Sequence, residues 1–240
     1  MCKFFSFVTD PVNHPAEYYF LDWEYRKENL DNDGGADSHS HICAHFKLDE
    51  DRCNKYEFDP LTKGFVIDQI NAVWDDSEAA EKWARRLNFK EIVEPLVVKP
   101  IVNPFELPKV SEPTNEQIGW LKEWNSVWDS VWDSVWNSVW NSVRNSVGDA
   151  VWNSVRNSVW NSVRNSVRNS VRNSVWDSVV ASVWEYIGSF FEIRYNSGDI
   201  SSAVKLWEAG LVPSFDGTTW RLHSGKNADV VFEWTPEKGA

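Results

Sequence analysis

Cysteine is scarce in this chain of 240 residues, which contains only Cys2, Cys43 and Cys53. Three cysteines are too few for a disulfide-stapled scaffold, and their odd number leaves at least one of them unpaired. Proteins that rely on disulfides fold in oxidising compartments, so this usage indicates a reducing interior. The sequence therefore excludes the class of small, disulfide-rich secreted domains.

Positive charge is also in short supply. The chain has 24 Lys and Arg against 36 Asp and Glu, and its formal net charge is -12. A protein that binds duplex DNA or an anionic membrane needs an excess of cations to replace the counterions held there. This balance argues against a general binder of duplex DNA or of a membrane surface.

Long apolar runs are missing as well. No run approaches the roughly 18 residues that a membrane-spanning helix needs. The first residues, Met1–Ser6, lead quickly to Asp10 and Pro11, so the apolar stretch is too short for a secretory signal. We therefore expect a soluble, acidic, cytoplasmic protein without a membrane segment.

Tryptophan, in contrast, is abundant, and a repeat supplies eight of the 16 residues. From residue 125 to residue 184 the chain consists of fifteen tetrapeptides of the form Asn/Asp-Ser-Val-Trp/Arg. Valine fills the third position of every unit, from Val127 to Val183. The fourth position is Trp in eight units, Arg in five, and Gly148 or Val180 in the other two. Three positions of the unit are thus nearly constant, and one varies.

Two structures compete for the repeat. In an α-helix a four-residue period turns each stripe by about 40° per unit, so no fixed face would be buried, and these residue types are middling to poor helix formers. In a β-solenoid, Asn or Asp would take the corners, while Val would point inward and Trp or Arg outward. The flanks keep the four-residue spacing, with Trp120 and Trp124 before the repeat and Ile187 and Phe191 after it, which favours a helix. We predict α+β flanking segments around a repeat rod that forms a β-solenoid; the alternative is one long α-helix.

The fourth position of the unit predicts a binding surface. Eight Trp side chains amount to roughly 1,600 Å² of aromatic surface, and a soluble monomer seldom exposes a contiguous apolar patch beyond several hundred Å². We therefore expect this column to meet the flanking domains, a second copy of the chain or another partner. The candidate binding residues are Trp128, Trp132, Trp136, Trp140, Arg144, Trp152, Arg156, Trp160, Arg164, Arg168, Arg172, Trp176 and Trp184.

Composition divides the chain into five segments. Residues 1–99 are predicted to form an α+β domain, and residues 100–114, which contain four prolines, a stiff linker. Residues 115–124 are predicted to form a short helix that leads into the repeat at 125–184. Residues 185–240 are predicted to form a C-terminal cap of a helix and a β-hairpin, too small in apolar content to fold alone.

Strand signals in the N-terminal domain are rich in aromatic residues. Lys3–Thr9 and Glu17–Trp23 are predicted strands on either side of a Pro-marked turn. Asn54–Asp59 and Gly64–Gln69 are predicted to pair as a hairpin around the turn Pro60–Lys63.

Helix signals come from capping residues. Asp76 and Ser77 are predicted to start a helix that runs through Arg86, and Thr114–Gln117 matches a capping box. Ser201–Ala209 is predicted to form a helix that Gly210 ends. Three strands are then predicted at Val212–Phe215, Thr218–His223 and Asp229–Trp234.

Potential metal ligands cluster in one short segment. His41 and His45 are four residues apart, so on a helix they would share a face and could hold zinc together, with Cys53 or Cys43 as a third ligand. A structural zinc site needs four ligands, however, and no Cys-x-x-Cys pair accompanies these residues. We therefore predict no cofactor, with zinc at His41, His45 and Cys53 as the less favoured hypothesis.

Motifs for catalysis are missing. The sequence contains no Gly-x-Ser-x-Gly and no glycine-rich phosphate loop, which argues against the enzymes that depend on them. Stacked Trp and Arg suit single-stranded nucleic acid, but five Arg and four Asp leave the repeat nearly neutral. We predict a non-enzymatic interaction or structural protein whose repeat mediates self-association or binding of a protein partner. The alternatives are an enzyme or small-ligand sequestering protein in residues 1–99, with the repeat as a spacer, and a stacking platform for single-stranded nucleic acid.

The repeat also carries a resemblance. Together with its exit Trp184–Phe191 and the stretches Leu206–Gly217 and Asn54–Pro60, it resembles uncharacterised phage- and prophage-type proteins with tetrapeptide repeats. This resemblance implies a viral or mobile-element origin, a host-cell interior as the location and a variable repeat number. It implies no activity and no catalytic residues.

Overall fold

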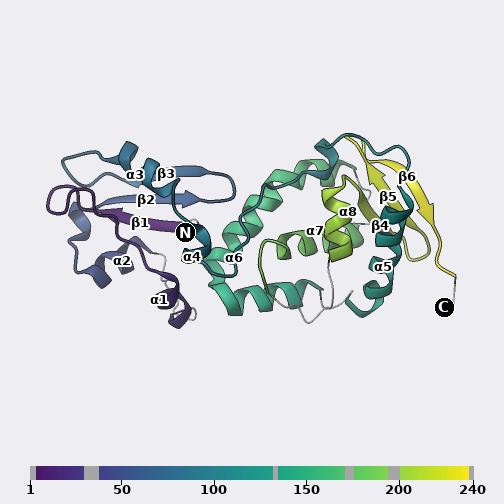
Figure 1. The fold of residues 1–240 in the computed structure, drawn as a ribbon, viewed down its shortest axis with the longest axis horizontal. Helices are drawn as coiled ribbons and strands as arrows, with labels where there is room; N and C mark the ends of the chain where they lie inside the picture. The colour runs from purple at the N-terminus through teal and green to yellow at the C-terminus, as the bar shows by residue number, and fades with distance from the viewer. Residues whose placement is uncertain (1–3, 30–37, 132–134, 171–175, 194–200, 238–240) are drawn as a thin grey trace. The chain divides into compact units, whose positions relative to one another are not determined.

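The computed structural model describes residues 4–29, 38–131, 135–170, 176–193 and 201–237 (Figure 1). These residues form two compact units with an α+β architecture. Unit 1 comprises Met1–Pro100, Val143–Arg156 and Phe191–Ile193. Unit 2 comprises Ile101–Ser142, Asn157–Phe190 and Arg194–Ala240. Among the described residues, no helix combines the length and the apolar composition that a membrane crossing requires.

Unit 1 is built on an antiparallel sheet with the strand order β1-β2-β3 (Figure 1). The strands are β1 (Phe5–Thr9), β2 (Asn54–Asp59) and β3 (Gly64–Gln69). The hairpin predicted around Pro60–Lys63 is thus confirmed with its predicted bounds. Its turn forms because the Asp59 carboxylate accepts the backbone N–H groups of Leu61 and Thr62, an Asx-type turn.

Helices cover both faces of this sheet. They are α1 (Trp23–Glu28), α2 (His39–Phe46), the 3-10 turn η1 (Glu50–Arg52), α3 (Ser77–Ala84) and α4 (Phe89–Ile92). Helix α2 packs on β1 and α3 on β2. Val8 joins Ile42 of α2 in one core cluster, whereas its neighbour Phe7 contacts Trp83 of α3 with ring centroids 4.9 Å apart. Because successive residues of a strand face opposite ways, α2 and α3 lie on opposite faces.

The strand predicted at Glu17–Trp23 is wrong. Only Tyr19 pairs, through an isolated bridge to Val8, and Trp23 already belongs to α1. The aromatic residues that suggested a strand cover the core instead, since Tyr18 stacks on Trp83 at 4.3 Å. Strand preference of aromatic residues reflects burial on a surface more than an intrinsic backbone preference, so a covering loop meets the same need.

Unit 2 packs helices against a second antiparallel sheet. Its strands are β4 (Val212–Phe215), β5 (Trp220–Ser224) and β6 (Asp229–Trp234), in the order β4-β5-β6. Its helices include α5 (Asn115–Val131), α7 (Trp176–Gly188) and α8 (Ser201–Glu208). Helix α5 packs on α8, and α7 packs on α8 and β4.

Two predicted helix boundaries in unit 2 are confirmed. Thr114 and Gln117 form a reciprocal capping box at the start of α5, with bonds of 3.2 and 2.9 Å. Gly210 follows α8 with a φ of 76°, which suits a residue without a side chain. A Cβ on Gly210 would also come within 3.3 Å of Pro104 O, so close packing adds to the requirement for glycine.

The segment 101–110 runs along unit 2 and contacts several of its elements. The Val102 N–H donates to the Tyr186 hydroxyl at 2.8 Å, and Trp207 Nε1 donates to Val102 O at 3.0 Å. The 3-10 turn η2 (Pro104–Glu106) buries Phe105. The Val110 N–H donates to Ser224 Oγ at 3.0 Å. The segment therefore contributes to the core of unit 2.

The repeat is α-helical wherever the structure describes it, so the predicted β-solenoid is wrong. The alternative of one long helix is wrong as well, because the chain forms the separate helices α5, α6 (Val135–Ser170) and α7. The physical reason lies in the valines, which are buried in consecutive units of α6: Val139, Val143, Val147, Val151, Val155 and Val159.

Burial along α6 follows the drift of the valine stripe. From Val139 to Val159 the stripe turns by about 200° around the helix, so the side that is buried changes along its length. Helix α6 contributes Val143–Arg156 to unit 1 and its two ends to unit 2. The helix therefore does not need one apolar face along its whole length. The burial of its valines outweighs the weak helix propensity of the repeat residues.

The serines of the repeat suit a helix too. Ser126 Oγ donates to Glu123 O at 2.7 Å, and the buried Ser182 Oγ donates to Val179 O at 2.8 Å. Such bonds to the carbonyl three residues earlier satisfy a hydroxyl inside its own helix. Serine in this position can therefore be buried without a polar partner from another element.

Candidate functional site

The repeat residues predicted to bind a partner are largely covered where their side chains are described. Trp128 is 5% exposed and Trp152 is 1% exposed. Trp140, Arg156, Trp160 and Trp184 are half-buried. The remaining predicted side chains lie outside the described part of the structure: Trp132, Trp136, Arg144, Arg164, Arg168, Arg172 and Trp176.

Trp128 belongs to the aromatic core of unit 2. Its ring lies edge-on to Trp124 at 5.7 Å and to Trp220 at 5.4 Å. Phe215 stacks on Trp220 at 4.8 Å. This part of the repeat therefore attaches α5 to the sheet of unit 2, and Trp128 offers almost no surface to a ligand.

The predicted metal ligands do not come together. His41 Nε2 lies 2.6 Å from the Tyr25 hydroxyl, and the His45 ring packs edge-on to the same tyrosine at 4.6 Å. Cys53 is fully buried in the core cluster of Val8 and Ile42. No group of three or more His, Cys, Asp or Glu residues arranged to hold a metal occurs in the described part of the chain.

The cysteine pair has the surroundings of structural thiols. Cys43 and Cys53 are both free and buried. Their mutual hydrogen bond lowers the pKa of the Cys43 thiol, and the same bond together with burial raises the pKa of Cys53. A reactive cysteine needs exposure as well as a stable thiolate, so the nucleophile hypothesis gains no support from this geometry.

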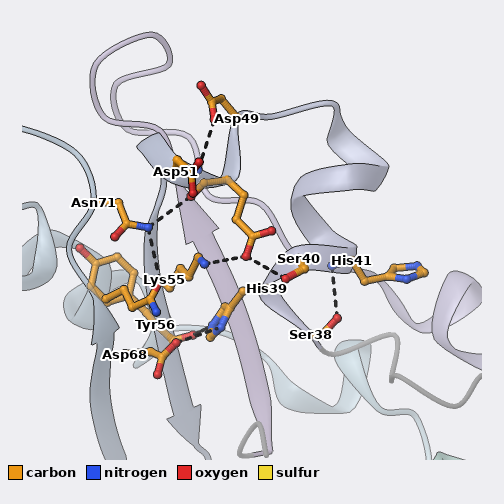
Figure 2. Close-up of polar contacts among 12 residues, drawn as sticks. Ser38, His39, Ser40, His41, Asp49, Asp51, Lys55, Tyr56, Asp68 and Asn71 are labelled. Atoms are coloured by element: carbon orange, nitrogen blue, oxygen red, sulfur yellow. Dashed lines mark hydrogen bonds and ion pairs between the residues drawn. The ribbon is translucent and has the colours of Figure 1, made fainter.

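A polar network connects α2 and η1 to β2 and β3 (Figure 2). His39 Nε2 lies 3.0 Å from Tyr56 O, and because a carbonyl only accepts, Nε2 carries a proton. His39 Nδ1 faces the Asp68 carboxylate at 3.4 Å. The imidazole therefore bridges the two strands from the first residue of α2.

An ion pair extends the same network. Lys55 Nζ donates to Glu50 Oε1 at 2.6 Å, and Ser40 Oγ donates to the same oxygen at 2.7 Å. The hydrogen bond from Lys55 and then that from Ser40 lower the pKa of the Glu50 carboxyl. Asn71 Nδ2 donates to Glu50 O at 3.2 Å, so the network also holds the chain that follows β3.

One buried amide fixes the loop between β3 and α3. The Asn54 side chain accepts the Ala72 N–H at 2.9 Å and donates to Trp74 O at 2.9 Å and to Asp76 Oδ1 at 2.8 Å. Asp76 Oδ1 also accepts the Tyr56 hydroxyl at 2.6 Å, and burial, then this bond, raises the pKa of Tyr56. The backbone of the loop is thus held on both sides of Trp74.

The side chains of this fixed loop face solvent. Val73 is 96% exposed and Trp74 is 68% exposed, and Ile67 and Ile70 just before them are also exposed. We name these four residues, which lie within eight consecutive positions of the sequence, the 67–74 patch. They are four of the eight large apolar side chains that are exposed in the described part of the chain. The sequence signal for this patch is the apolar stretch Ala72–Trp74 between the polar residues Asn71 and Asp75, which matches none of the motifs considered above.

A serine–histidine pair in unit 2 has the geometry of a nucleophile and a base. Ser214 Oγ lies 2.7 Å from His223 Nε2, and His223 Nδ1 lies 3.0 Å from Ala228 O. Burial lowers the pKa of His223. Ser214 is fully buried, however, and the orienting group is a backbone carbonyl instead of a carboxylate. The pair therefore holds β4, β5 and the turn before β6 together.

Glu185 of α7 is buried without compensation. The residue is fully buried, and neither carboxyl oxygen has a hydrogen-bond partner among the described residues. Burial raises the pKa of this carboxyl from 4.5 to about 8. A buried acid in this state keeps its proton at neutral pH.

No protein-family model, no curated protein and no solved structure matches this chain.

Proposed function

We propose that this chain is a non-enzymatic interaction protein that binds a protein partner through the 67–74 patch. The observation that carries the proposal is the combination of a fixed backbone with exposed apolar side chains at Val73 and Trp74. Exposed apolar groups that cluster on a soluble protein commonly mark an interaction site. A Trp on a backbone that is fixed before binding costs less conformational freedom on association than one on a mobile loop, so more of its burial contributes to affinity.

The repeat has a supporting role in this proposal. Its valines and two of its described Trp side chains are buried. The repeat helices therefore contribute core residues to both units. The resemblance to phage- and prophage-type proteins supports a host or viral protein as the partner. The burial of Ser214 gives little support to a hydrolase, and the nearly neutral charge of the repeat sequence gives little support to a nucleic-acid platform.

The experiment uses site-specific photo-crosslinking in the cell that expresses the full chain. A photoreactive phenylalanine replaces Trp74 in one variant and Val230, an exposed residue of β6, in the control. The captured protein is identified, purified and titrated against the unmodified chain. We expect capture from position 74 alone, and we expect Trp74→Ser to weaken the two-component affinity by about 2 kcal/mol or more, roughly thirtyfold. Equal affinity of the wild type and Trp74→Ser would exclude the patch as the binding site.

A further inference from the structure

Asp68 occupies an extra position in strand β3. In the β2–β3 ladder Tyr56 pairs with Ile67, but its neighbour Lys55 pairs with Gln69. Asp68 is therefore left without a partner in β2 and forms a β-bulge. A bulge interrupts the ladder locally and changes the direction of a side chain, and the Asp68 side chain points toward the start of α2 (Figure 2).

The His39 ring spans this bulge. Its Nε2 lies 3.0 Å from the carbonyl oxygen of Tyr56, beside the bulge on β2, and its Nδ1 lies 3.4 Å from Asp68 Oδ2 on β3 (Figure 2). The histidine is only 6% exposed, whereas the Asp68 side chain is 45% exposed. One buried ring of α2 thus contacts both strands, with one nitrogen on each.

Both partners of the ring are hydrogen-bond acceptors. A carbonyl oxygen and an ionised carboxylate can only accept, so both contacts are favourable together only when both ring nitrogens carry protons. A neutral imidazole has a single proton. Tyr56 is fully buried on the central strand, where a lost hydrogen bond is costly, whereas water can reach Asp68. A neutral ring therefore keeps its proton on Nε2 and loses the contact with Asp68.

We propose that His39 acts as a pH-sensitive clamp that joins the bulge of β3 to α2 when its ring is cationic and releases Ile67–Gln69 when Nδ1 loses its proton. The clamp requires a protonated histidine and an ionised aspartate. It is therefore closed at mildly acidic pH and opens as the pH rises through the range in which histidine titrates. This proposal does not rest on the proposed function.

Charged groups on the neighbouring elements leave Asp68 as the acid that pairs with the ring. Glu50 of η1 also interacts electrostatically with His39, but its carboxylate already binds Lys55 of β2 at 2.6 Å. Strand β1, which also contacts α2, contains no charged residue, and His41 of α2 contacts α1 instead. The positive end of the α2 dipole opposes a cation at its first residue, so the clamp depends on Asp68.

The end of β3 is the segment that the clamp controls. Ile67, Asp68 and Gln69 are all exposed, and the bulge weakens the ladder between them and β2. Segments with little burial and few ladder bonds open locally at low cost in free energy. Loss of the contact with α2 is therefore expected to increase local opening at 67–69 without unfolding the sheet.

Amide hydrogen exchange with millisecond mixing tests the clamp in the full chain. Wild type and His39→Gln are compared at pH 5.5 and at pH 8.0, because glutamine keeps a donor for Tyr56 O but cannot become cationic. Comparison at the same pH cancels the intrinsic exchange rate. We expect the variant to exchange at least about threefold faster across 67–69 at pH 5.5 and at nearly the wild-type rate at pH 8.0. The amides of Phe5–Thr9 serve as the internal reference and are expected to be unchanged.

A second substitution and a direct measurement of the protons complete the test. Asp68→Asn, at an exposed side chain, is expected to show the same dependence on pH, with circular dichroism confirming that it is folded. Nitrogen-15 NMR of the wild-type ring is expected to show a proton on Nε2 at both pH values and a proton on Nδ1 only at pH 5.5.

A double-mutant cycle of His39→Gln and Asp68→Asn measures the coupling in the unfolding equilibrium. We expect coupling of at least about threefold at pH 5.5 and none at pH 8.0. His14→Gln with Glu17→Gln is the matched control, because this histidine and acid are both exposed and 3.9 Å apart; its coupling is expected to stay below about twofold. Equal exchange of wild type and variants at pH 5.5, the same acceleration at both pH values, or a neutral ring protonated on Nδ1 would overturn the proposal.

Discussion

The hydrogen bonding of single buried polar groups has large effects on this protein, and Asn54 and Glu185 are opposite cases. The oxygen and the nitrogen of the Asn54 amide both form hydrogen bonds, and these bonds fix a loop whose apolar side chains face solvent. The Glu185 carboxyl is fully buried and has no partner among the described residues. A buried acid without hydrogen bonds costs several kcal/mol when ionised and much less when protonated. Its protonation is therefore linked to the stability of unit 2.

Glu185→Gln tests this linkage. The folded-state pKa of about 8 exceeds the ordinary 4.5, so the folded chain keeps a proton that the unfolded chain releases between these values. The contribution of Glu185 to stability is greatest below pH 4.5, falls as the pH rises and levels off above about 8, with a slope of at most about 1.4 kcal/mol per pH unit. We expect Glu185→Gln to remove this slope and to raise the free energy of unfolding at pH 8.5, measured by urea denaturation.

Glu123→Gln, at an exposed position of α5, serves as the control and is expected to keep the wild-type slope. The same pH dependence in the wild type and in Glu185→Gln would contradict the assignment.

Elements differ in how much of their structure is encoded locally. The β2–β3 hairpin, the capping box of α5 and the end of α8 at Gly210 follow from residues within a few positions of each boundary, and their prediction is confirmed. The predicted strand at Glu17–Trp23 is wrong because its aromatic residues are used to cover Trp83, a residue about 65 positions away.

Helix α6 allows a direct test of the valine stripe. Val143→Ala removes two buried methyl groups and leaves a cavity, so we expect a loss of about 2 kcal/mol in the free energy of unfolding. Asn145→Ala changes an exposed residue of the same helix; it is expected to have no effect or a slight stabilising one, because Ala is the better helix former. Urea denaturation measures both, and equal losses would mean that the valines are not the stabilising face.

At the scale of the whole molecule, the path of the chain indicates why the number of repeat units matters. Helix α6 passes from unit 2 into unit 1 and back to unit 2. A rod that serves only as a spacer would tolerate the loss of a unit, whereas a helix whose valines belong to two different cores must keep its length. The buried valines of six consecutive units favour the second description.

Deletion of residues 153–156 distinguishes these descriptions. Removing one unit places Val159 where Val155 stood and draws the end of α6 back by about 6 Å with a turn of about 40°, so the chain that follows α6 is displaced from its place in unit 2. We expect a large drop in the thermal midpoint, followed by circular dichroism. Asn153→Asp, which keeps the length, is expected to change stability by no more than about 0.5 kcal/mol. A deletion variant as stable as this control would identify the repeat as a spacer.

The sequence by itself determined the β2–β3 hairpin, the capping box of α5 and the end of α8 at Gly210, because backbone conformation and capping depend on neighbouring residues. Only the tertiary structure decided whether the repeat would be helix or solenoid. Its intrinsic propensities are weak, and the burial of its valines depends on which distant segments remove water from each of them. The 67–74 patch was decided in the same way, since Val73 and Trp74 are exposed because Asn54, about twenty positions earlier, holds their backbone in place.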